Sequence, residues 1–499
     1  MNTDAAQPHE KDAAPEKEQD VEIGKSEVAS DTEQPGKGAD MPFHIPKNPD
    51  ELKKERSKFQ SFEASGNYAN YQVFVQNMNL EGPQQYKEVP VQEKDKKKAR
   101  FDLKEPADCA EFVEEYKNGE YLALTIILAV FDIVSINDLP DMAEKLMDAL
   151  PAVEEVDQNG NVVRSRSREP YLSLQCKLAV IGAGTFVRGD GQRCVGFGSK
   201  SKQVLRNIRE QFPALRVPII SWLIKVNDNY KYKTGFDAQQ MVQAFSRVIA
   251  LDFADAKREI FPRLYSRPEN MLFLGTLAST LLKDPSLEDD VLSITQTWAE
   301  SGKWLWKSAL FAYAKLDVPE ACGKLKDLLQ KNIATHMEGF SEADMFFLSL
   351  ALSCSVHVRT MMCEILYQKL SSKTSKKVEK DEAAGFYLTL VTYCYYYVNE
   401  RSLELPLVVC DTKEQQQLLA PALAQVLSSR DSRRWLFDLL ELYLKEISGY
   451  SVPARLVRHT AAYFSNMMRS APVYKEDVSA LLRKCSCGMT QEIFKLLGI

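Results

Sequence analysis

Residues 287–298, LEDDVLSITQTW, contain the pattern that decides the fold. Leu287, Val291, Ile294 and Trp298 stand at i, i+4, i+7 and i+11, the spacing of an amphipathic helix with one buried face. The same spacing returns across residues 252–370, in short segments separated by Pro, Gly, Ser or Asp. Further members of the pattern are Trp306, Leu310, Tyr313, Val358, Met361, Met362, Ile365 and Leu366. Because short amphipathic helices bury their apolar faces only against one another, the sequence predicts a body of stacked helices.

The periodic segments continue to the end of the sequence. They are uneven in length, which indicates a degenerate helical repeat, and we expect a HEAT-like α-solenoid over residues 231–499. A charged break is predicted at Lys373–Asp381, and Asp431 is a plausible N-cap. The predicted helices are Met241–Leu251, Ala254–Leu264, Asn270–Leu282, Leu287–Glu300, Trp304–Leu316, Pro319–Gln330, Glu342–Ser353, Val356–Ser371, Ala383–Val398, Lys413–Ser428, Asp431–Ile447, Pro453–Met468, Lys475–Lys484 and Thr490–Leu497.

The charge is unevenly distributed along the chain. Residues 1–40 hold eleven acidic and four basic side chains, whereas the whole chain has a formal net charge of −6. The remaining residues therefore carry a net charge of only +1. A nearly neutral body has no global field that attracts nucleic acid, so such binding would need a local basic patch.

The sequence favours a cytoplasmic location. Met1–Asp20 is polar and acidic, so no secretory signal is expected. The longest apolar run, Tyr121–Phe131, falls far short of the roughly 20 residues that a membrane helix needs. Ten cysteines without a disulfide framework fit a reducing compartment.

The part before the helical array is predicted to be a small α+β portion. Residues 1–55 have the composition of a disordered acidic tail. Residues 56–104 are expected to form short strands, one of them at Tyr71–Val75, and a basic linker at Lys94–Arg100. Residues 105–230 are predicted to contain helices and two β-hairpins, turning at Asn159-Gly160 and Asp190-Gly191. This succession of helices and hairpins would also suit a winged-helix-like module.

Residues 203–223 read QVLRNIREQFPALRVPIISWL. This segment resembles one that recurs in helical regions of large bacterial signalling ATPases and their linked effectors, where a Phe/Tyr-Pro-x-Leu-Arg stop joins two helices. The resemblance covers about residues 105–330, and HEAT-like repeats are the broader similarity. It implies an accessory or sensor-like region. The ATPase activity is not carried over, because the sequence has no phosphate loop.

Two glycine-containing segments suggest nucleotide binding at first sight. Gly24-Lys25-Ser26 lacks the upstream glycine of a phosphate loop, since Gln19 occupies that position. Gly182-Ala183-Gly184 approaches a dinucleotide fingerprint, but Val187 stands where the third glycine is needed. We expect these glycines to end a helix and turn the chain, and we predict no cofactor.

No set of residues has the spacing of a metal or catalytic site. Cys485 and Cys487 form the one close thiol pair, and zinc sites normally combine two such pairs. A structural or incidental role is favoured, with redox activity as the open alternative. The five histidines share no ligand or nucleophile spacing.

Two clusters are candidate partner-binding residues. Tyr393, Tyr396 and Tyr397 lie close together on one predicted helix, where core packing is ranked first, a protein-binding surface second and nucleic-acid stacking third. In the other cluster, Arg164, Arg166 and Arg168 alternate with serines. They resemble a phosphate-binding arm, although the outer face of a hairpin is the favoured interpretation.

The sequence thus favours a non-enzymatic scaffold that binds a protein partner along a helical-repeat surface. One alternative is a nucleic-acid-associated protein that uses the winged-helix-like portion. A nucleotide-dependent enzyme is the third possibility, and it depends on Gly182–Gly184 alone.

Overall fold

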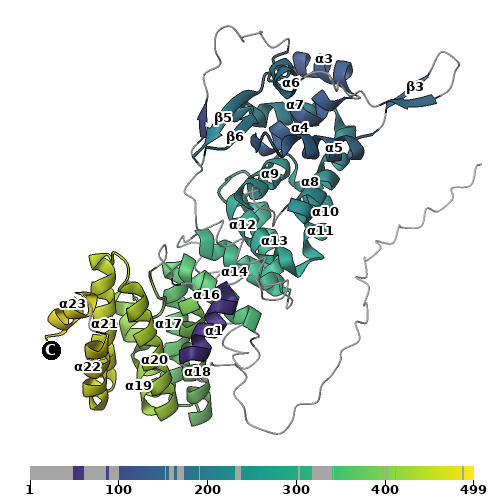
Figure 1. The fold of residues 1–499 in the computed structure, drawn as a ribbon. Coiled ribbons are helices and arrows are strands. Elements are labelled where there is room, and N and C mark those ends of the chain that lie inside the picture. The colour runs from purple at the N-terminus through teal and green to yellow at the C-terminus, as the bar shows by residue number, and fades with distance from the viewer. Residues whose placement is uncertain are drawn as a thin grey trace, which may run out of the picture. The chain divides into compact units, whose positions relative to one another are not determined.

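A computed structural model of the chain describes residues 49–60, 86–88, 101–117, 119–151, 153–156, 162–165, 173–189, 191–230, 238–301, 304–316, 340, 342–396, 398, 403–410, 412–485 and 488–498. All of them belong to one unit, Phe43–Ile499. Most of these residues are helical, which confirms the predicted fold class at its coarse level (Figure 1). Among the described helices, none is both long and apolar enough to span a membrane.

The first part of the unit combines helices with short strands. Its elements are α1 (Pro49–Gln60), β1 (Tyr86–Glu88), α3 (Pro106–Tyr116), α4 (Glu120–Phe131), β2 (Ile133–Ser135), α5 (Leu139–Ala149), β3 (Val153–Val156), β4 (Val162–Ser165), α6 (Leu174–Val180), β5 (Gly184–Arg188), β6 (Arg193–Gly196), α7 (Ser201–Gln211) and α8 (Arg216–Tyr230). One antiparallel sheet has the order β1-β5-β6-β2, and β3 pairs with β4 in a second. The two strands that flank each predicted turn are therefore paired, β3 with β4 and β5 with β6. The turn residues Asn159, Gly160 and Asp190 lie outside the described residues.

Helix α4 is the centre of this part. Every residue from Tyr121 to Phe131 is buried, which explains why the apolar run has no polar face. The helix contacts α5, α7 and α9. A helix that is apolar all round is stable only inside such a shell. The run predicted to be too short for a membrane is thus the core helix.

Gly182 and Gly184 turn the chain between a helix and a strand, as predicted. Helix α6 begins at its N-cap Ser173 and ends at Val180, and Gly182 then takes a φ of 69°. That conformation suits glycine, and β5 starts two residues later. A dinucleotide-binding turn has the opposite order, with the strand before the glycines and the helix after them.

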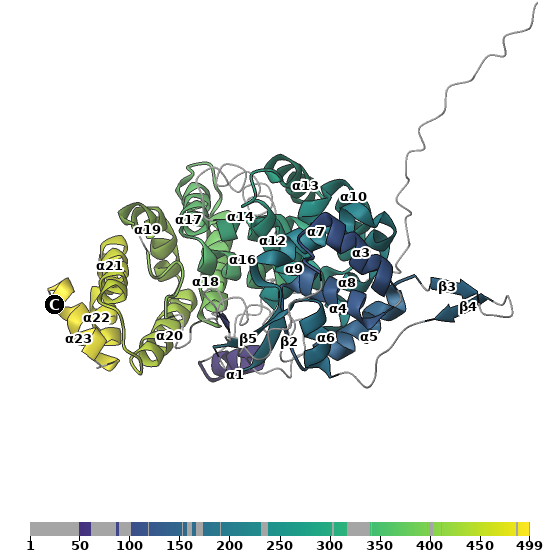
Figure 2. The ribbon, with the colours of Figure 1, turned by 90° about the horizontal axis from the view of Figure 1, so that it is seen from above.

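The second part is entirely helical among its described elements. They are α9 (Ala238–Leu251), α10 (Phe253–Glu259), α11 (Phe261–Tyr265), α12 (Met271–Leu281), α13 (Glu288–Glu300), α14 (Leu305–Leu316), α16 (Glu342–Cys354), α17 (Val356–Ser371), α18 (Lys377–Tyr396), α19 (Lys413–Ser428), α20 (Arg430–Ile447), α21 (Ala454–Ser470), α22 (Lys475–Lys484) and α23 (Gly488–Leu497). From α12 onward, most contacts between helices join helices that are one or two positions apart in the chain order. Helices α17, α19 and α21 form one row, and α16, α18 and α20 form another (Figure 2).

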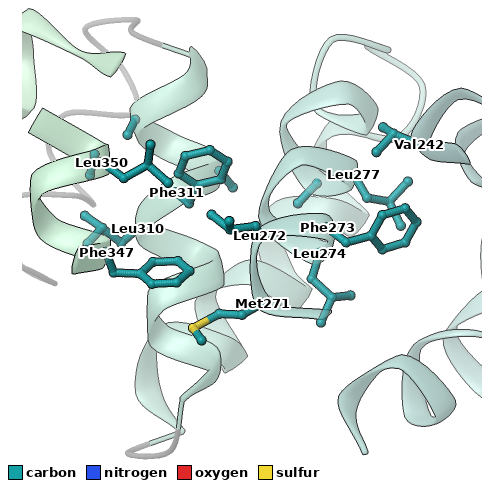
Figure 3. Packing of buried hydrophobic residues seen from close by; sticks show 14 of the residues in the cluster. Val242, Met271, Leu272, Phe273, Leu274, Leu277, Leu310, Phe311, Phe347 and Leu350 are labelled. Atoms are coloured by element: carbon teal, nitrogen blue, oxygen red, sulfur yellow. The ribbon is translucent and has the colours of Figure 1, made fainter. Parts of the chain in front are cut away.

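Helix α12 shows how closely these helices pack. Phe273 and Leu277 point toward α9, whereas Met271 and Leu272 point toward α14 (Figure 3). A Cβ atom added to Gly275 would lie 2.8 Å from the carbonyl oxygen of Ser308 on α14. Glycine therefore permits the closest approach of these two helices.

Several predicted boundaries were wrong for local reasons. The segment predicted as one helix, Ala254–Leu264, is two helices, because Pro262 lies at the start of α11 and cannot continue α10. Helix α18 begins at Lys377 and therefore includes residues 377–381 of the predicted charged break Lys373–Asp381. Ser429 rather than Asp431 is the N-cap of α20, and Asp431 lies in its first turn.

Other predictions fall outside the described residues. These are residues 1–48 of the acidic tail 1–55, the strand at Tyr71–Val75, the linker Lys94–Arg100 and the helix Pro319–Gln330. The prediction of disorder was wrong for residues 49–55, which form the start of helix α1 and include the buried Leu52.

Candidate functional site

A cavity of about 330 Å³, lined by both charged and apolar residues, lies among the helices of the second part. Residues from four segments converge on it: the end of α16, the start of α17, the connection before α19 and the start of α21. Its lining residues are Ser353, Arg359, Leu403, Glu404, Pro406, Pro453, Arg455 and Leu456. This cavity is the candidate functional site.

The charged groups of the cavity form a chain of two ion pairs. Arg359 Nη1 lies 3.4 Å from Glu404 Oε2, and Arg455 Nη2 lies 3.7 Å from Glu404 Oε1. The side chains of Arg359, Glu404 and Arg455 are 8%, 36% and 57% exposed, in that order. The Glu404 carboxylate thus lies between the buried guanidinium of Arg359 and the exposed guanidinium of Arg455. The described lining residues carry a net charge of +1.

Local capping places Arg359 in the cavity. Ser355 is the N-cap of α17, and its hydroxyl accepts the Val358 N–H at 3.1 Å. The Arg359 N–H donates to the Ser355 carbonyl at 3.2 Å, which closes the first helical turn. A Ser N-cap satisfies an otherwise unpaired donor at a helix start. Arg359 therefore lies in the capped first turn of its helix.

Glu404 is held by an unusually tight connection. The Leu405 carbonyl accepts the N–H groups of Val408 and Val409, at 3.1 and 2.8 Å. Leu407 has a φ of 67°, a conformation that is uncommon for a bulky residue and costs energy. The strained connection is buried and fixed, so Glu404 is presented from a rigid backbone.

Buried tyrosines anchor the same connection. The Tyr443 hydroxyl donates to the Leu403 carbonyl at 3.0 Å, and the Tyr387 hydroxyl donates to the Leu407 carbonyl at 3.5 Å. The Tyr387 and Tyr463 oxygens lie 3.0 Å apart. Burial raises the pKa of all three phenols, so these groups stay protonated and act as hydrogen-bond partners.

The fourth segment contributes the start of a long helix. Helix α21 has Pro453 as its N-cap, no side-chain cap hydrogen bond and no acidic residue in its first turn. The first N–H groups of a helix lack intrahelical partners and carry a partial positive charge. Because Pro453, Arg455 and Leu456 line the cavity, this helix start adds to its positive potential.

The thiols near the cavity are poor nucleophiles. Burial raises the pKa of both Cys363 and Cys394, and the nearby Arg359 only partly offsets this effect. A protonated thiol is unreactive compared with a thiolate. The Ser353 hydroxyl donates to the Ser349 carbonyl at 2.9 Å, so it is already engaged. Neither these thiols nor the Ser353 hydroxyl is therefore an activated nucleophile.

The predicted tyrosine cluster packs along α18. The rings of Tyr393 and Tyr396 meet edge to face at 5.4 Å. Tyr396 is buried and Tyr393 half-buried, whereas Tyr397 lies outside the described residues. Tyr395, between them, is buried with its hydroxyl 3.5 Å from Glu446 Oε2. A partner-binding role for Tyr393, Tyr396 and Tyr397 stays a prediction.

The arginine cluster is not assembled into a site by the described residues. Arg164 lies in β4, opposite Glu154 of β3, and Arg166 and Arg168 lie outside the described residues. Their proposed contact with phosphates stays a prediction.

The predicted thiol pair is only partly described. Cys485 is buried, which limits its access to oxidants, and Cys487 lies outside the described residues. Within the part of the chain that the structure describes, no three His, Cys, Asp or Glu side chains are grouped as a metal site would require.

The Phe212-Pro213-x-Leu215-Arg216 segment lies beside a second cavity, which measures about 40 Å³. The segment joins α7 to α8 through a short 3₁₀ turn, as the sequence pattern predicts. Arg216 lies 3.3 Å from Asp255 and 3.7 Å from Asp252. These ion pairs connect the start of α8 to the start of α10.

Sequence patterns could not identify the larger cavity. Arg359, Glu404 and Arg455 are far apart in the chain and share no motif spacing. They come together only because α17 stacks on α19 and α19 stacks on α21. The one local signal is the Pro-containing segment 403–409, LELPLVV, whose apolar character marks a buried connection. Comparison with known proteins adds no assignment: no family model, curated protein or solved structure matches this chain.

Proposed function

We propose that the chain is a scaffold whose HEAT-like helical-repeat body binds a protein partner. The observation that carries the proposal is the packing order of α16 to α23. One layer contains α17, α19, α21 and α23, and the other contains α16, α18, α20 and α22. Such stacking produces a continuous face made of equivalent helices, which repeat proteins use for binding other proteins.

The chemistry of the larger cavity supports binding over catalysis. Its side chains are two arginines and a glutamate in ion pairs, a serine bonded to the backbone, and apolar groups. Arginine is enriched in protein interfaces because its planar group combines charge with apolar contact. An anchoring point of this kind beside a helical layer suits a partner-binding scaffold.

The experiment is a cross-linked capture from the source cells, carried out after nuclease treatment. We expect a partner protein to be retained in stoichiometric amount. Tyr367, an exposed aromatic residue of α17, should contribute, because aromatic side chains dominate interface energetics. Tyr367→Ala should therefore reduce capture at unchanged thermal stability. Val217→Ala, which alters an exposed residue of α8, is the matched control and should retain the partner.

The alternative is a nucleic-acid-binding protein that uses a winged-helix-like portion in residues 105–230. A DNA titration distinguishes this alternative from the scaffold. A scaffold should bind duplex DNA only non-specifically, with a Kd on the order of 10⁻⁴ to 10⁻⁶ M at physiological salt. Sub-micromolar, sequence-selective binding that disappears when Arg164, Arg166 and Arg168 are changed to glutamine would refute the scaffold proposal in favour of this alternative.

A further inference from the structure

We propose that the face formed by α18 and α20 binds an amphipathic helix of the partner protein, and that α1 occupies this face until the partner helix replaces it. The inference rests on the proposed function in taking a protein partner as the source of that helix. It adds a contact surface in the layer of α16, α18, α20 and α22, and a segment of the chain that regulates access to this surface.

Helix α1 packs on helices that come much later in the chain. It contacts both α18 and α20, and Figure 1 shows it beside α18. Helices α18 and α20 also contact each other, so α1 lies on two consecutive helices of one layer. The docking of an amphipathic helix on a surface made by other helices is a recurring mode of peptide recognition. The chain thus contains an example of the ligand that this face accepts.

Leu52 is the anchor of α1. Its side chain is fully buried and belongs to the hydrophobic core. On the same helix, Asp50, Lys53 and Lys54 are exposed, so one buried apolar position lies among charged ones. Burial of one leucine strengthens an association roughly tenfold or more. A partner helix therefore needs an apolar side chain at the position equivalent to Leu52.

Helix α18 has the burial of a helix that is covered on all sides. Every residue from Ala383 to Thr392 is buried. A surface helix normally leaves a polar face to solvent, and its neighbour α20 does so with Arg434 and Lys445. In addition to its neighbours α16, α17, α19 and α20, α18 contacts α1. The face that α1 occupies is therefore apolar enough to hold a helix.

The attachment of α1 is suited to replacement. Helix α1 has 12 residues, and an isolated helix of this length is marginally stable in water. Its sequence is rich in charged residues, and segments of such composition become ordered only on a surface, which weakens the complex by the cost of ordering. A partner helix with the same anchor and a lower ordering cost binds the face more strongly than α1 does.

The covalent connection gives α1 an advantage that the test can remove. A segment of the same chain binds at a high effective concentration. A competitor binds only those molecules in which α1 has left the face, so its apparent affinity falls with the fraction of free face. Weakening the anchor of α1 should therefore strengthen the binding of every competing helix.

The test uses the full-length protein and a fluorescent peptide with the sequence of residues 47–60, KNPDELKKERSKFQ. The peptide should bind the Leu52→Ala protein roughly tenfold or more tightly than the wild type, because this substitution frees the face. Lys53→Ala, which alters an exposed residue of the same helix, is the matched control and should bind the peptide as the wild type does. A peptide that itself carries Leu52→Ala should bind the Leu52→Ala protein roughly tenfold or more weakly.

Cross-linking locates the binding surface. In a second peptide, photoreactive benzoylphenylalanine replaces Glu51, which is half-buried beside the anchor. Mass spectrometry of the cross-linked Leu52→Ala protein should find the peptide attached to α18 and α20. Absence of peptide binding, or attachment to other helices, would overturn the assignment of the surface.

Capture of the partner distinguishes this inference from the scaffold proposal. The Leu52→Ala protein should retain more partner than the wild type or Lys53→Ala. Equal capture by all three would refute the regulation by α1 and leave the scaffold proposal standing. Reduced capture by Leu52→Ala, or lower thermal stability without a gain in peptide binding, would mean that α1 is only a structural part of the unit. If the peptide results are as expected but no protein is captured, the proposed function fails and α18 and α20 remain a helix-binding surface.

Discussion

At the scale of single residues, buried aromatic groups combine packing with satisfied polar atoms. Trp298 packs edge to face on Phe261 and Tyr265, with ring centroids 6.1 and 5.6 Å away. Its indole N–H donates to the Tyr265 oxygen at 2.7 Å. Burial raises the pKa of Tyr265, although this hydrogen bond partly counteracts the effect. The apolar stripe predicted from Leu287 to Trp298 is thus buried, as the periodicity indicated.

Replacing Trp298 should be strongly destabilising. Trp298→Ala removes a side chain that is 1% exposed and should cost roughly 3–5 kcal/mol of unfolding free energy, as large-to-small core changes do. Tyr265→Phe, which removes only the acceptor, should cost about 1–3 kcal/mol, the usual penalty for one unsatisfied buried donor. Urea unfolding measures both. An unchanged midpoint for Trp298→Ala would show that this residue does not support the core.

Asp252 should make stability depend on pH. Its carboxylate accepts the Asp255 N–H at the start of α10 and also pairs with Arg209, and these contacts lower its pKa in the folded protein. A lowered folded-state pKa means that the contribution is present above the ordinary Asp pKa of about 3.9 and is lost as the pH falls through the folded value.

The variant Asp252→Asn isolates this charge, because Asn caps helices about as well as Asp. The wild type should be more stable than the variant at pH 5 to 7, and the difference should shrink below about pH 4. Unfolding free energies measured from pH 2.5 to 7 test the expectation. A difference that stays constant with pH would show that Asp252 acts only as a cap.

At the scale of elements, local sequence predicts whether a helix is buried on all sides or on one face. Some helix boundaries, in contrast, depend on tertiary contacts. The apolar run at α4 and the periodic run at α13 are clear from the residues themselves. The start of α18 is not, since Lys377–Glu382 is strongly charged and becomes helical together with the buried segment that follows. At α20, both Ser429 and Asp431 are suitable caps, and sequence alone does not choose between them.

The contact between α12 and α14 should not tolerate a larger residue. Alanine is the better helix former by about 1 kcal/mol, which alone would favour Gly275→Ala. The added Cβ would lie 2.8 Å from the Ser308 carbonyl oxygen and 3.0 Å from the Phe311 side chain. Overpacking of this kind typically costs about 1–3 kcal/mol, so we expect net destabilisation.

Gly488 is the matched control, because a Cβ there meets no atom within 4 Å. Gly488→Ala, in the first position of α23, should be neutral or slightly stabilising. Thermal unfolding of both variants tests the contrast. If Gly275→Ala raised the midpoint, the close approach of α12 and α14 would not exist in solution.

At the scale of the whole molecule, function depends on how the helices are stacked. Helix periodicity predicts which face of each helix is buried, but it does not say which helices become neighbours. Arg359, Glu404 and Arg455 belong to segments about 45 and 50 positions apart, so their meeting is a property of the stack. This is why the fold class could be predicted from the sequence, whereas the candidate site could not.

The stacking order predicts which helices lose stability when a buried residue of one helix is replaced. Helix α13 contacts α12 and α14, and α20 contacts α18, α19 and α22. In a repeat array, each unit is stabilised mainly by its nearest neighbours. Trp298→Ala should therefore reduce amide hydrogen-exchange protection in α12–α14 well before α20–α22. Leu440→Ala, which removes a fully buried side chain of α20, should instead reduce protection in α20–α22 well before α12–α14.

Native-state hydrogen exchange followed by mass spectrometry compares the two regions within one chain, for both variants. Equal loss of protection in both regions, whichever residue is changed, would mean that the unit unfolds as a single cooperative core, and the helical-repeat proposal would be wrong.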